Sequence, residues 1–316
     1  MSLELIAVGA ANVDLVAEVE RLPQADEEVQ IEALRIEPGG SAANVAVGVG
    51  RLGHRAGFLG QVGEDRFGQL LMEGFREEGV DTSHVLRRGP AGLAVALVHH
   101  GIRFLYTYGG GAREFGPEHI DIAEDYLKRA KLLHLASIDS PRGAATLAHA
   151  AEIAEEAEIK VIFDPGHLAV DWGLRALEPI LRNTYAFLPS ESEVERLLGS
   201  PAEAAELLDY GPEAVVVTRG ERGCLLVTED GLEEFPAYRP REIVDPIGAG
   251  DAFAAGFIVA LLEGKGLKEA CRFANYVAAR SLERPGGRSV PRREELDRRA
   301  EDAVRSNWGI KGCRSG

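Results

Sequence analysis

The chain has few residues that cross-link a fold, and it has no long apolar run. Three cysteines, Cys224, Cys271 and Cys313, are spread over 316 residues, and no two of them form a CxxC pair. This excludes a disulfide framework and indicates a reducing compartment, so we expect a cytoplasmic protein. The eight histidines show no metal-ligand spacing such as HExxH. No apolar run reaches the length of a membrane span, and the N-terminus lacks the layout of a signal peptide.

Basic residues are also in deficit. The chain has 35 Lys and Arg against 51 Asp and Glu, which gives a formal net charge of -16. Phosphate backbones and anionic membrane surfaces repel such a chain, so we expect neither nucleic acid nor a membrane as a partner. An anionic small molecule would need local cationic groups or backbone N–H groups. The length allows an ample core, and we expect a single α/β domain over residues 1–316.

The order of apolar segments indicates the fold class. From residue 130 onwards, strand-like runs alternate with helical segments at 141–158 and 174–181. The strand candidates are residues 132–136, 160–164, 185–188 and 214–218. This alternation predicts right-handed crossovers and a doubly wound, mostly parallel sheet. Two early strand pairs, at about 13–37 and 92–108, do not suit the middle of such a sheet, and we expect them to form a small β-sheet lid.

The most informative stretch is residues 245–253, with the sequence DPIGAGDAF. It follows the short extended segment 242–244 and precedes an Ala- and Leu-rich run, which predicts a strand, a glycine turn and a helix. Gly248 and Gly250 let backbone approach a ligand, and the free N–H groups of the first helical turn favour an anion. Asp251 at this turn is either an N-cap or a base that accepts a hydroxyl proton while the turn holds a phosphoryl group.

Polar residues also follow the first predicted strand, residues 3–9. Asn12 and Asp14 lie beyond its carboxyl end, where ligands gather in α/β sheets, and are suited to hydrogen-bond a polyol. The alternative is an ordinary Asx turn. The next motif, residues 38–46 (PGGSAANVA), opens a helix whose glycines admit a ligand and whose Asn44 can present its amide to it.

Four further features each have a functional and a structural interpretation. Arg113 meets an acidic group or phosphate of the substrate, or it is a surface arginine. Glu193 closes a capping box on Ser190, or it points at the water shell of a magnesium ion. The glycine-flanked turn 218–223 holds a nucleotide phosphate, or it only turns the chain. The loop 284–290 wraps the base of a nucleotide or exposes carbonyl groups to a monovalent cation.

The motifs at 39–46 and 245–251, in this order and about this far apart, resemble those of the ribokinase-like (PfkB-type) carbohydrate kinases. The resemblance extends over nearly the whole chain, from residues 12–14 to 289–291. It implies a ribokinase-like α/β fold with a small lid. It also implies transfer of the γ-phosphoryl group of ATP to a hydroxyl of a small carbohydrate, with Mg²⁺ as cofactor. A Walker A sequence is absent, so such an enzyme would work without a P-loop lysine.

The resemblance assigns roles to particular residues. It makes Asp251 the catalytic base. The anion hole beside this base would be formed by Gly248, Ala249 and Gly250. The sugar hydroxyls would be held by Asn12, Asp14, Gly39, Gly40 and Asn44, with Arg113 near the substrate. The nucleotide would be bordered by Thr218, Gly220, Gly223 and Asn275. The monovalent-cation site of some members, which takes K⁺, corresponds to Asp245, Ile247 and Ser289.

Two positions depart from the family pattern. Ser190 replaces the Asn of an Asn-x-x-Glu sequence near magnesium, although Glu193 remains. Ala136 or Ser137 stands where ribokinases usually carry a Glu, which argues against ribose itself as the acceptor. The sequence leaves open which sugar is phosphorylated and whether ATP is the donor. Since lid-to-lid pairing is common in this family, we also expect a homodimer through the lid.

Three other functions are compatible with some of these features. The main alternative is a nucleoside kinase of the same fold, which uses the same base and anion hole. A nucleotide-binding module without catalysis is disfavoured because the sequence GAGD at 248–251 is intact. A dinucleotide-dependent oxidoreductase is disfavoured because GxGxxG does not follow the first strand.

Overall fold

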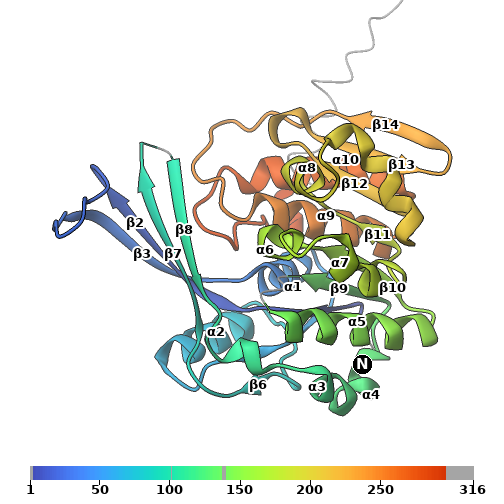
Figure 1. Cartoon of the computed structure of the whole chain (residues 1–316), viewed down its shortest axis with the longest axis horizontal. Coiled ribbons are helices and arrows are strands. Elements are labelled where there is room, and N and C mark those ends of the chain that lie inside the picture. Colours follow the sequence, from blue (N-terminus) through green and yellow to red (C-terminus); the bar gives the residue numbers. More distant parts are fainter. Residues whose placement is uncertain (1–2, 101, 137–139, 297–316) are drawn as a thin grey trace, which may run out of the picture.

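The computed structural model describes residues 3–100, 102–136 and 140–296. Its main feature is an eight-stranded sheet (Figure 1). The strand order is β14 (Gly231–Phe235), β13 (Cys224–Thr228), β12 (Ala214–Thr218), β11 (Ala186–Phe187), β10 (Lys160–Asp164), β9 (Leu132–Ala136), β1 (Leu5–Val8) and β4 (Ala56–Leu59). The strands from β12 to β4 run parallel, and β13 and β14 are antiparallel. The predicted doubly wound, mostly parallel sheet is confirmed.

Helices cover both faces of this sheet, which explains why its strands are apolar throughout. In β1, Leu5 and Ala7 belong to one buried cluster, and Ile6 and Val8 belong to the other. The first face is covered by α1 (Ser41–Arg51), α2 (Arg66–Glu77), α9 (Ala249–Leu262) and α10 (Leu267–Ser281). The second face is covered by α3 (Pro117–Ile122), α4 (Glu124–Leu127), α5 (Pro141–Glu156), α7 (Leu174–Leu181), α8 (Glu191–Leu198) and the 3₁₀ segment η2 (Pro201–Tyr210).

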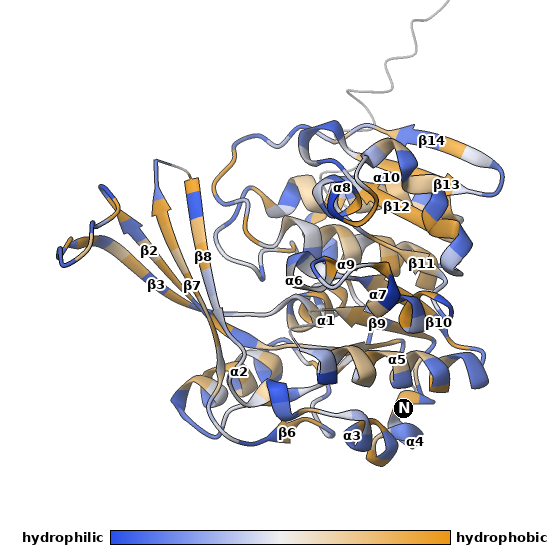
Figure 2. Cartoon of the chain, viewed as in Figure 1, coloured by the Kyte–Doolittle hydropathy of each residue, from blue (hydrophilic) through white to orange (hydrophobic). Residues whose placement is uncertain are grey.

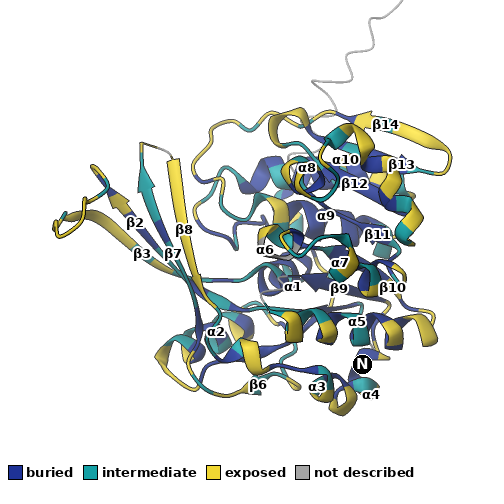
Figure 3. Cartoon of the chain, viewed as in Figure 1, coloured by how far each residue is buried: buried dark blue, intermediate teal, exposed yellow. Residues whose placement is uncertain are grey.

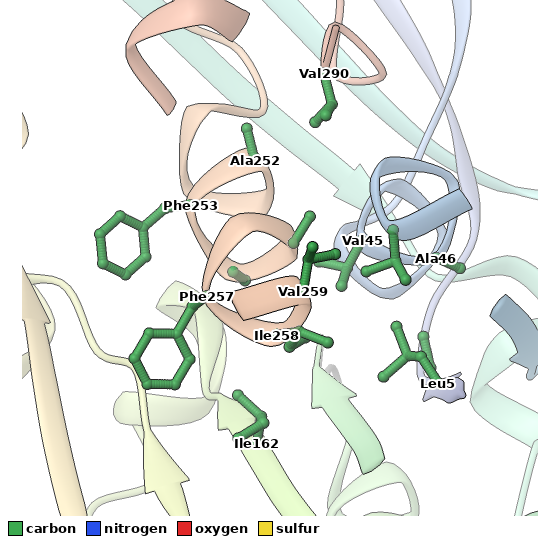
Figure 4. Close-up of a cluster of buried hydrophobic side chains, with 14 of the residues drawn as sticks. Leu5, Val45, Ala46, Ile162, Ala252, Phe253, Phe257, Ile258, Val259 and Val290 are labelled. Carbon is green, nitrogen blue, oxygen red and sulfur yellow. The ribbon is translucent and has the colours of Figure 1, made fainter. Parts of the chain in front are cut away.

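Helix α9 is the central helix of the first face. Its residues from Ala252 to Ala260 are all buried, because it lies between the sheet, α1 and α10. Small residues permit this close packing, since a Cβ on Gly256 would lie 3.0 Å from the Cα of Ala274 in α10. Val259 of α9 points toward Val45 of α1 in the core (Figure 4). The core therefore fixes α9 firmly, and with it the position of the turn at its N-terminus.

A second sheet of four strands stands beside the main body, on the left in Figure 1. Its order is β3 (Ile31–Gly39), β2 (Asn12–Val19), β7 (Gly92–His99) and β8 (Ile102–Tyr108). β2 and β7 pair in parallel, while each outer strand is antiparallel to its neighbour. We call this sheet the lid. Two short strands, β5 (Gln61–Val62) and β6 (Leu86–Arg87), pair near its base.

One expectation is wrong. Residues 242–244 form no strand, although they were expected to be the strand before the glycine turn. The N–H groups of Val244 and Asp245 donate instead to the carbonyl of Leu282, at the end of α10. Ile243 and Val244 are 68% and 49% exposed. Their β-propensity has no neighbouring strand to pair with, so the segment runs over the surface in extended form.

Two further observations concern the setting of the protein. Cys224 and Cys271 are buried and unpaired by disulfide. Within the ranges that the structure describes, no helix has the length and apolar character needed to cross a membrane. The cytoplasmic location stays a prediction from the cysteine content.

Candidate active site

The N-terminus of α9 is preceded by a turn that only glycine can form. We call residues 245–250 the α9 turn. Gly248 has a φ of 77°, and a Cβ there would lie 2.5 Å from the carbonyl oxygen of Gly287. The first backbone bond of the helix joins Ala252 N–H to Gly248 O at 2.8 Å. The N–H groups of Gly250 and Asp251 therefore have no intrahelical acceptor, and the helix dipole favours an anion at this point.

Asp251 lies on the first turn of α9 and contacts α1. The Asn44 amide donates to its Oδ2 at 2.8 Å. Burial raises the pKa of Asp251 from its usual 3.8 to about 6, while the hydrogen bond from Asn44 acts in the opposite direction. A carboxylate whose pKa lies close to neutral is suited to accept a proton. The structure thus brings together Asn44 and Asp251, two residues that are 207 positions apart in the chain.

Asp14 lies next to this pair, at the start of lid strand β2. The Asn12 amide donates to its Oδ1 at 2.6 Å. Burial and the nearby carboxylates Asp251 and Glu37 together raise the pKa of Asp14 to about 6, while the Asn12 hydrogen bond acts in the opposite direction. Gly39 is required beside it, because a Cβ at Gly39 would lie 2.3 Å from Oδ2 of Asp14.

Gly40 serves the same region through its backbone. It has a φ of 96° and precedes the first residue of α1. A Cβ at Gly40 would lie 2.6 Å from the carbonyl oxygen of Ala10, so a larger residue could not bring α1 this close to the end of β1. The glycine pair predicted from sequence therefore has a clear steric cause.

A cavity of about 270 Å³ opens between the lid and the carboxyl end of the sheet, and we call it the lid cavity. Asn12 lines it, together with Leu105 and Thr107 of the lid. Arg113, in the 3₁₀ segment η1 (Gly110–Glu114), lies on its lining with an exposed side chain. His167, in α6 (Gly166–Val170), completes the lining on the sheet side and was not expected from sequence.

A larger cavity of about 930 Å³ lies on the other side of the α9 turn, and we call it the large cavity. All four residues predicted to border a nucleotide line it, namely Thr218, Gly220, Gly223 and Asn275. Gly250 lines it too, so the α9 turn faces this cavity. The Asn275 amide donates to the carbonyls of Phe235 and Pro236 at 3.1 and 3.3 Å, and so holds the wall of the cavity in place.

A third, acidic cavity of about 140 Å³ is lined by Gly250, Asp164 and Glu193. Glu193 makes the predicted capping box, since its Oε2 accepts the Ser190 N–H at 2.7 Å. Asp164 was not identified from sequence. Burial raises its pKa well above the usual range, and the charges of Glu193 and Asp251 add to this effect. Asp164 ends strand β10, and the strand-end rule that selected Asn12 and Asp14 could have found it.

The acidic cavity is compatible with a hydrated magnesium ion. In the described ranges, no three acidic, histidine or cysteine side chains form a group that could hold an ion directly. Mg²⁺ usually keeps several waters and binds through one or two carboxylates together with substrate phosphates. Asp164 and Glu193 provide such carboxylates beside Gly250 of the α9 turn. Burial is the main cause of the raised pKa of Asp164, and repulsion by the Glu193 charge adds to it. A bound cation would relieve this repulsion.

The residues expected to form a monovalent-cation site lie near each other, but their charge is already compensated. Both oxygens of the buried Asp245 accept hydrogen bonds, and Arg35 of β3 pairs with its Oδ2 at 2.9 Å. Ile247 donates its backbone N–H to Oδ1 of Asp245 at 2.9 Å. The Ser289 hydroxyl is buried and has no partner in the described chain. The carboxylate of this set is therefore already paired with a cationic side chain, so the set does not fit K⁺.

The departures noted from sequence can also be located. Ser190 is the N-cap of α8, and its hydroxyl accepts the N–H of Glu193 at 3.3 Å. Ala136 is the last residue of β9 and is fully buried, so this position itself carries no carboxylate. Ser137 lies outside the described residues.

Comparison with known proteins identifies the family. The family model for pfkB family carbohydrate kinases matches residues 2–293. The chain belongs to this family, and it is an ATP-dependent carbohydrate kinase. An uncharacterized sugar kinase of Archaeoglobus fulgidus is 36% identical over 251 residues, which are 78% of this chain and 99% of that protein. An ATP-dependent ribose-1-phosphate kinase of Halopiger xanaduensis is 33% identical over 292 residues, which are 92% of this chain and 95% of that protein.

Solved structures confirm the ribokinase-like fold with its separate lid. The Arabidopsis thaliana ribokinase complexed with ribose and ATP superimposes with a TM-score of 0.84 at 27% identity, covering 94% of this chain and 98% of that chain. A putative ribokinase II from E. coli, in complex with ATP and Mg²⁺, gives a TM-score of 0.81 at 26% identity and covers 95% and 99%.

Proposed function

We propose that Asp251 is the general base that accepts the proton of a sugar hydroxyl while the γ-phosphoryl group of ATP is transferred to that hydroxyl. The main observation is the position of Asp251. It lies at the N-terminus of α9, bonded to Asn44 on the sugar side, and the adjacent Gly250 faces the large cavity. Asn12 lines the lid cavity, whereas Asp14, Asn44 and Asp251 do not. In this proposal the acceptor therefore extends from the lid cavity to Asp251, and the large cavity takes ATP.

Phosphoryl transfer requires little covalent chemistry from the protein, because the transition state is loose and depends on positioning and charge. Asn12, Asp14 and Asn44 orient the acceptor hydroxyl toward Asp251. The backbone of Gly248, Ala249 and Gly250 then stabilises the oxygens of the transferred group, as an anion hole does. The lid covers the acceptor and keeps water from competing as a nucleophile.

Magnesium is proposed as the metal cofactor, held through water by Asp164 and Glu193. When bound, Mg²⁺ would supply positive charge that neutralises the donor phosphates. Thr218, Gly220, Gly223 and Asn275 would then border the nucleotide, in agreement with their position around one cavity. The volume of this cavity, about 930 Å³, is large enough for a nucleoside triphosphate.

The acceptor is proposed to be a small sugar. The lid cavity, at about 270 Å³, is below the usual range for drug-sized ligands and suits a single sugar ring better than a sugar with a nucleobase. Ribose itself is disfavoured by the missing carboxylate at Ala136. Arg113 on the cavity lining would meet an acidic group of the acceptor. A nucleoside kinase remains the alternative, because the lid is open on one side and could accommodate a longer acceptor.

A coupled assay of ADP release tests this proposal. Wild-type protein with ATP and Mg²⁺ is screened against sugars, sugar phosphates, keto-sugar acids and nucleosides, with Asp251→Asn as the control. We expect a sugar to be phosphorylated by the wild type and not by the variant. Phosphorylation of nucleosides alone would support the alternative. ATP binding without turnover on any acceptor would favour a non-catalytic module.

We further propose that the protein is a homodimer through the lid. The two faces of the lid differ, because residues opposite each other in the register share a face. Asp14 shares one face with Glu37 and Thr107, toward the site. The other face carries exposed apolar side chains, namely Leu34, Ile36, Phe104 and Tyr106. Strand β8 contains apolar segments in Figure 2 and is exposed along its length in Figure 3.

A second lid could cover this apolar face, since a self-complementary surface is what a two-fold dimer requires. Light scattering should give the mass of a dimer for the wild type. Tyr106→Glu should give a monomer, while Arg103→Gln, on the opposite face of the same strand, should leave the dimer intact. A monomeric wild type at working concentration would refute the proposal.

A further inference from the structure

Asp245 is a buried carboxylate at the start of the α9 turn. It is 5% exposed. Its Oδ1 accepts the Ile247 N–H at 2.9 Å, and its Oδ2 accepts the Gly286 N–H at 3.1 Å. The first bond lies within the α9 turn, and the second ties this turn to the loop 284–290. The charge of such a carboxylate must be compensated, because burial without a partner is costly.

The compensating charge comes from the lid. Arg35 of β3 donates from Nη2 to Asp245 Oδ2 at 2.9 Å, across 210 positions of sequence. Two other lid carboxylates flank the guanidinium, Glu18 at 3.2 Å from Nη1 and Glu37 at 3.3 Å from Nε. In the part of the chain that the structure describes, Arg35 is the cationic side chain that pairs with Asp245.

We propose that the Arg35 guanidinium takes the place of a monovalent cation at the α9 turn, so that MgATP binding requires no K⁺. Arginine stays charged at every working pH and supplies directional N–H donors, which suits a fixed compensating charge. This inference rests on the proposed function, since that function assigns the nucleotide phosphates to the α9 turn.

The same contact couples the turn to the lid. Arg35 lies two residues from Glu37, which is opposite Asp14 in the strand register. A movement of β3 would therefore displace the guanidinium from Asp245, and it would at the same time shift Glu37 relative to Asp14. The α9 turn has its charge balanced only when β3 is in place, so Arg35 is a positioning residue that acts through Asp245.

Calorimetric titration with MgATP tests this inference without knowledge of the acceptor. Wild type, Arg35→Met and Arg35→Lys are each titrated at equal ionic strength in KCl and in tetramethylammonium chloride. Tetramethylammonium cannot be coordinated by carboxylates, so only KCl can supply a replacement cation. Arg21→Met is the matched control, because Arg21 pairs with Glu27 at the lid and has no contact with Asp245.

We expect the wild type and Arg21→Met to bind MgATP equally in the two salts. Arg35→Met should bind about tenfold more weakly in tetramethylammonium, a modest loss for a charged hydrogen bond because the Arg35 side chain is 35% exposed. In KCl, the Arg35→Met variant should regain most of the lost MgATP affinity. Arg35→Lys should retain most of the affinity in both salts.

Several results would overturn the inference. Wild-type binding that strengthens with K⁺ would show that Arg35 does not replace the cation. A loss in Arg35→Met that K⁺ does not restore would indicate a structural role only. If Arg35→Met fails to fold, the wild type and Arg35→Lys still test the inference. MgATP affinity of either protein that is clearly higher in KCl than in tetramethylammonium chloride would contradict it. Absence of MgATP binding by the wild type in both salts is a distinct result, and it would contradict the proposed function itself.

Discussion

The substitution Asp251→Asn separates catalysis from folding in this protein. Asparagine has nearly the same shape, and its Oδ1 can still accept the hydrogen bond from Asn44, which is 2.8 Å in the wild type. The carboxylate that we propose as the acceptor of the hydroxyl proton is lost. Removal of a general base lowers kcat by roughly 10²–10⁴. MgATP affinity should change little, because the backbone of the α9 turn is retained.

The same substitution should increase stability near neutral pH. Burial raises the pKa of Asp251 from 3.8 to about 6 in the folded state. The folded protein therefore retains this proton in a pH range where the unfolded chain has released it. The group's stabilising contribution is complete below the unfolded pKa and is lost as the pH rises through the folded value.

At pH 7.5 the folded protein thus bears the cost of a partly buried charge that an asparagine avoids. The full shift corresponds to about 3 kcal/mol, and partial exposure of the carboxylate reduces this to about 1–2 kcal/mol. We expect Tm to rise by about 2–5 °C in the variant at pH 7.5, with little or no rise at pH 4.

Turnover by coupled ADP release and thermal unfolding by circular dichroism measure the two effects on the same preparation. In the wild type, kcat/KM should also fall as the pH drops below about 6, because the base becomes protonated. Near-normal turnover of Asp251→Asn would remove the base assignment. A loss of turnover accompanied by a lower Tm would refute the burial argument instead.

Three other predictions concern the surrounding groups. Asp14→Ala should raise the acceptor KM about tenfold or more with a smaller effect on kcat, and an unchanged KM would exclude Asp14 from acceptor binding. Gly250→Ala should keep the wild-type Tm, because a Cβ there meets nothing within 4 Å, but it should weaken MgATP binding by filling the space for phosphate. Gly248→Ala, with a φ of 77°, should instead lower Tm. Glu193→Gln should raise the Mg²⁺ concentration needed for half-maximal turnover, and an unchanged requirement would count against a magnesium role for Glu193.

The local sequence determined much of the fold. Strands β9, β10 and β12 begin and end where the apolar runs predicted, because burial on both faces leaves a continuous apolar signature in the chain. The turn before α9 was predicted from its glycines, since few other residues adopt the positive φ seen at Gly248. The capping box of Ser190 and Glu193 could also be predicted from sequence, because it depends only on two residues that are three positions apart.

The tertiary structure decided which of these local features meet. Asp164 joins Glu193 and Asp251 only because β10 ends at the same edge of the sheet as the α9 turn. The segment 242–244 has strand propensity but finds no strand to pair with. Arg35 reaches Asp245 only because β3 folds back over the site. The spacing of residue types along the chain predicts which residues are buried and where the chain turns. Contacts between distant segments depend on how the two sheets pack, and no local sequence pattern encodes that packing.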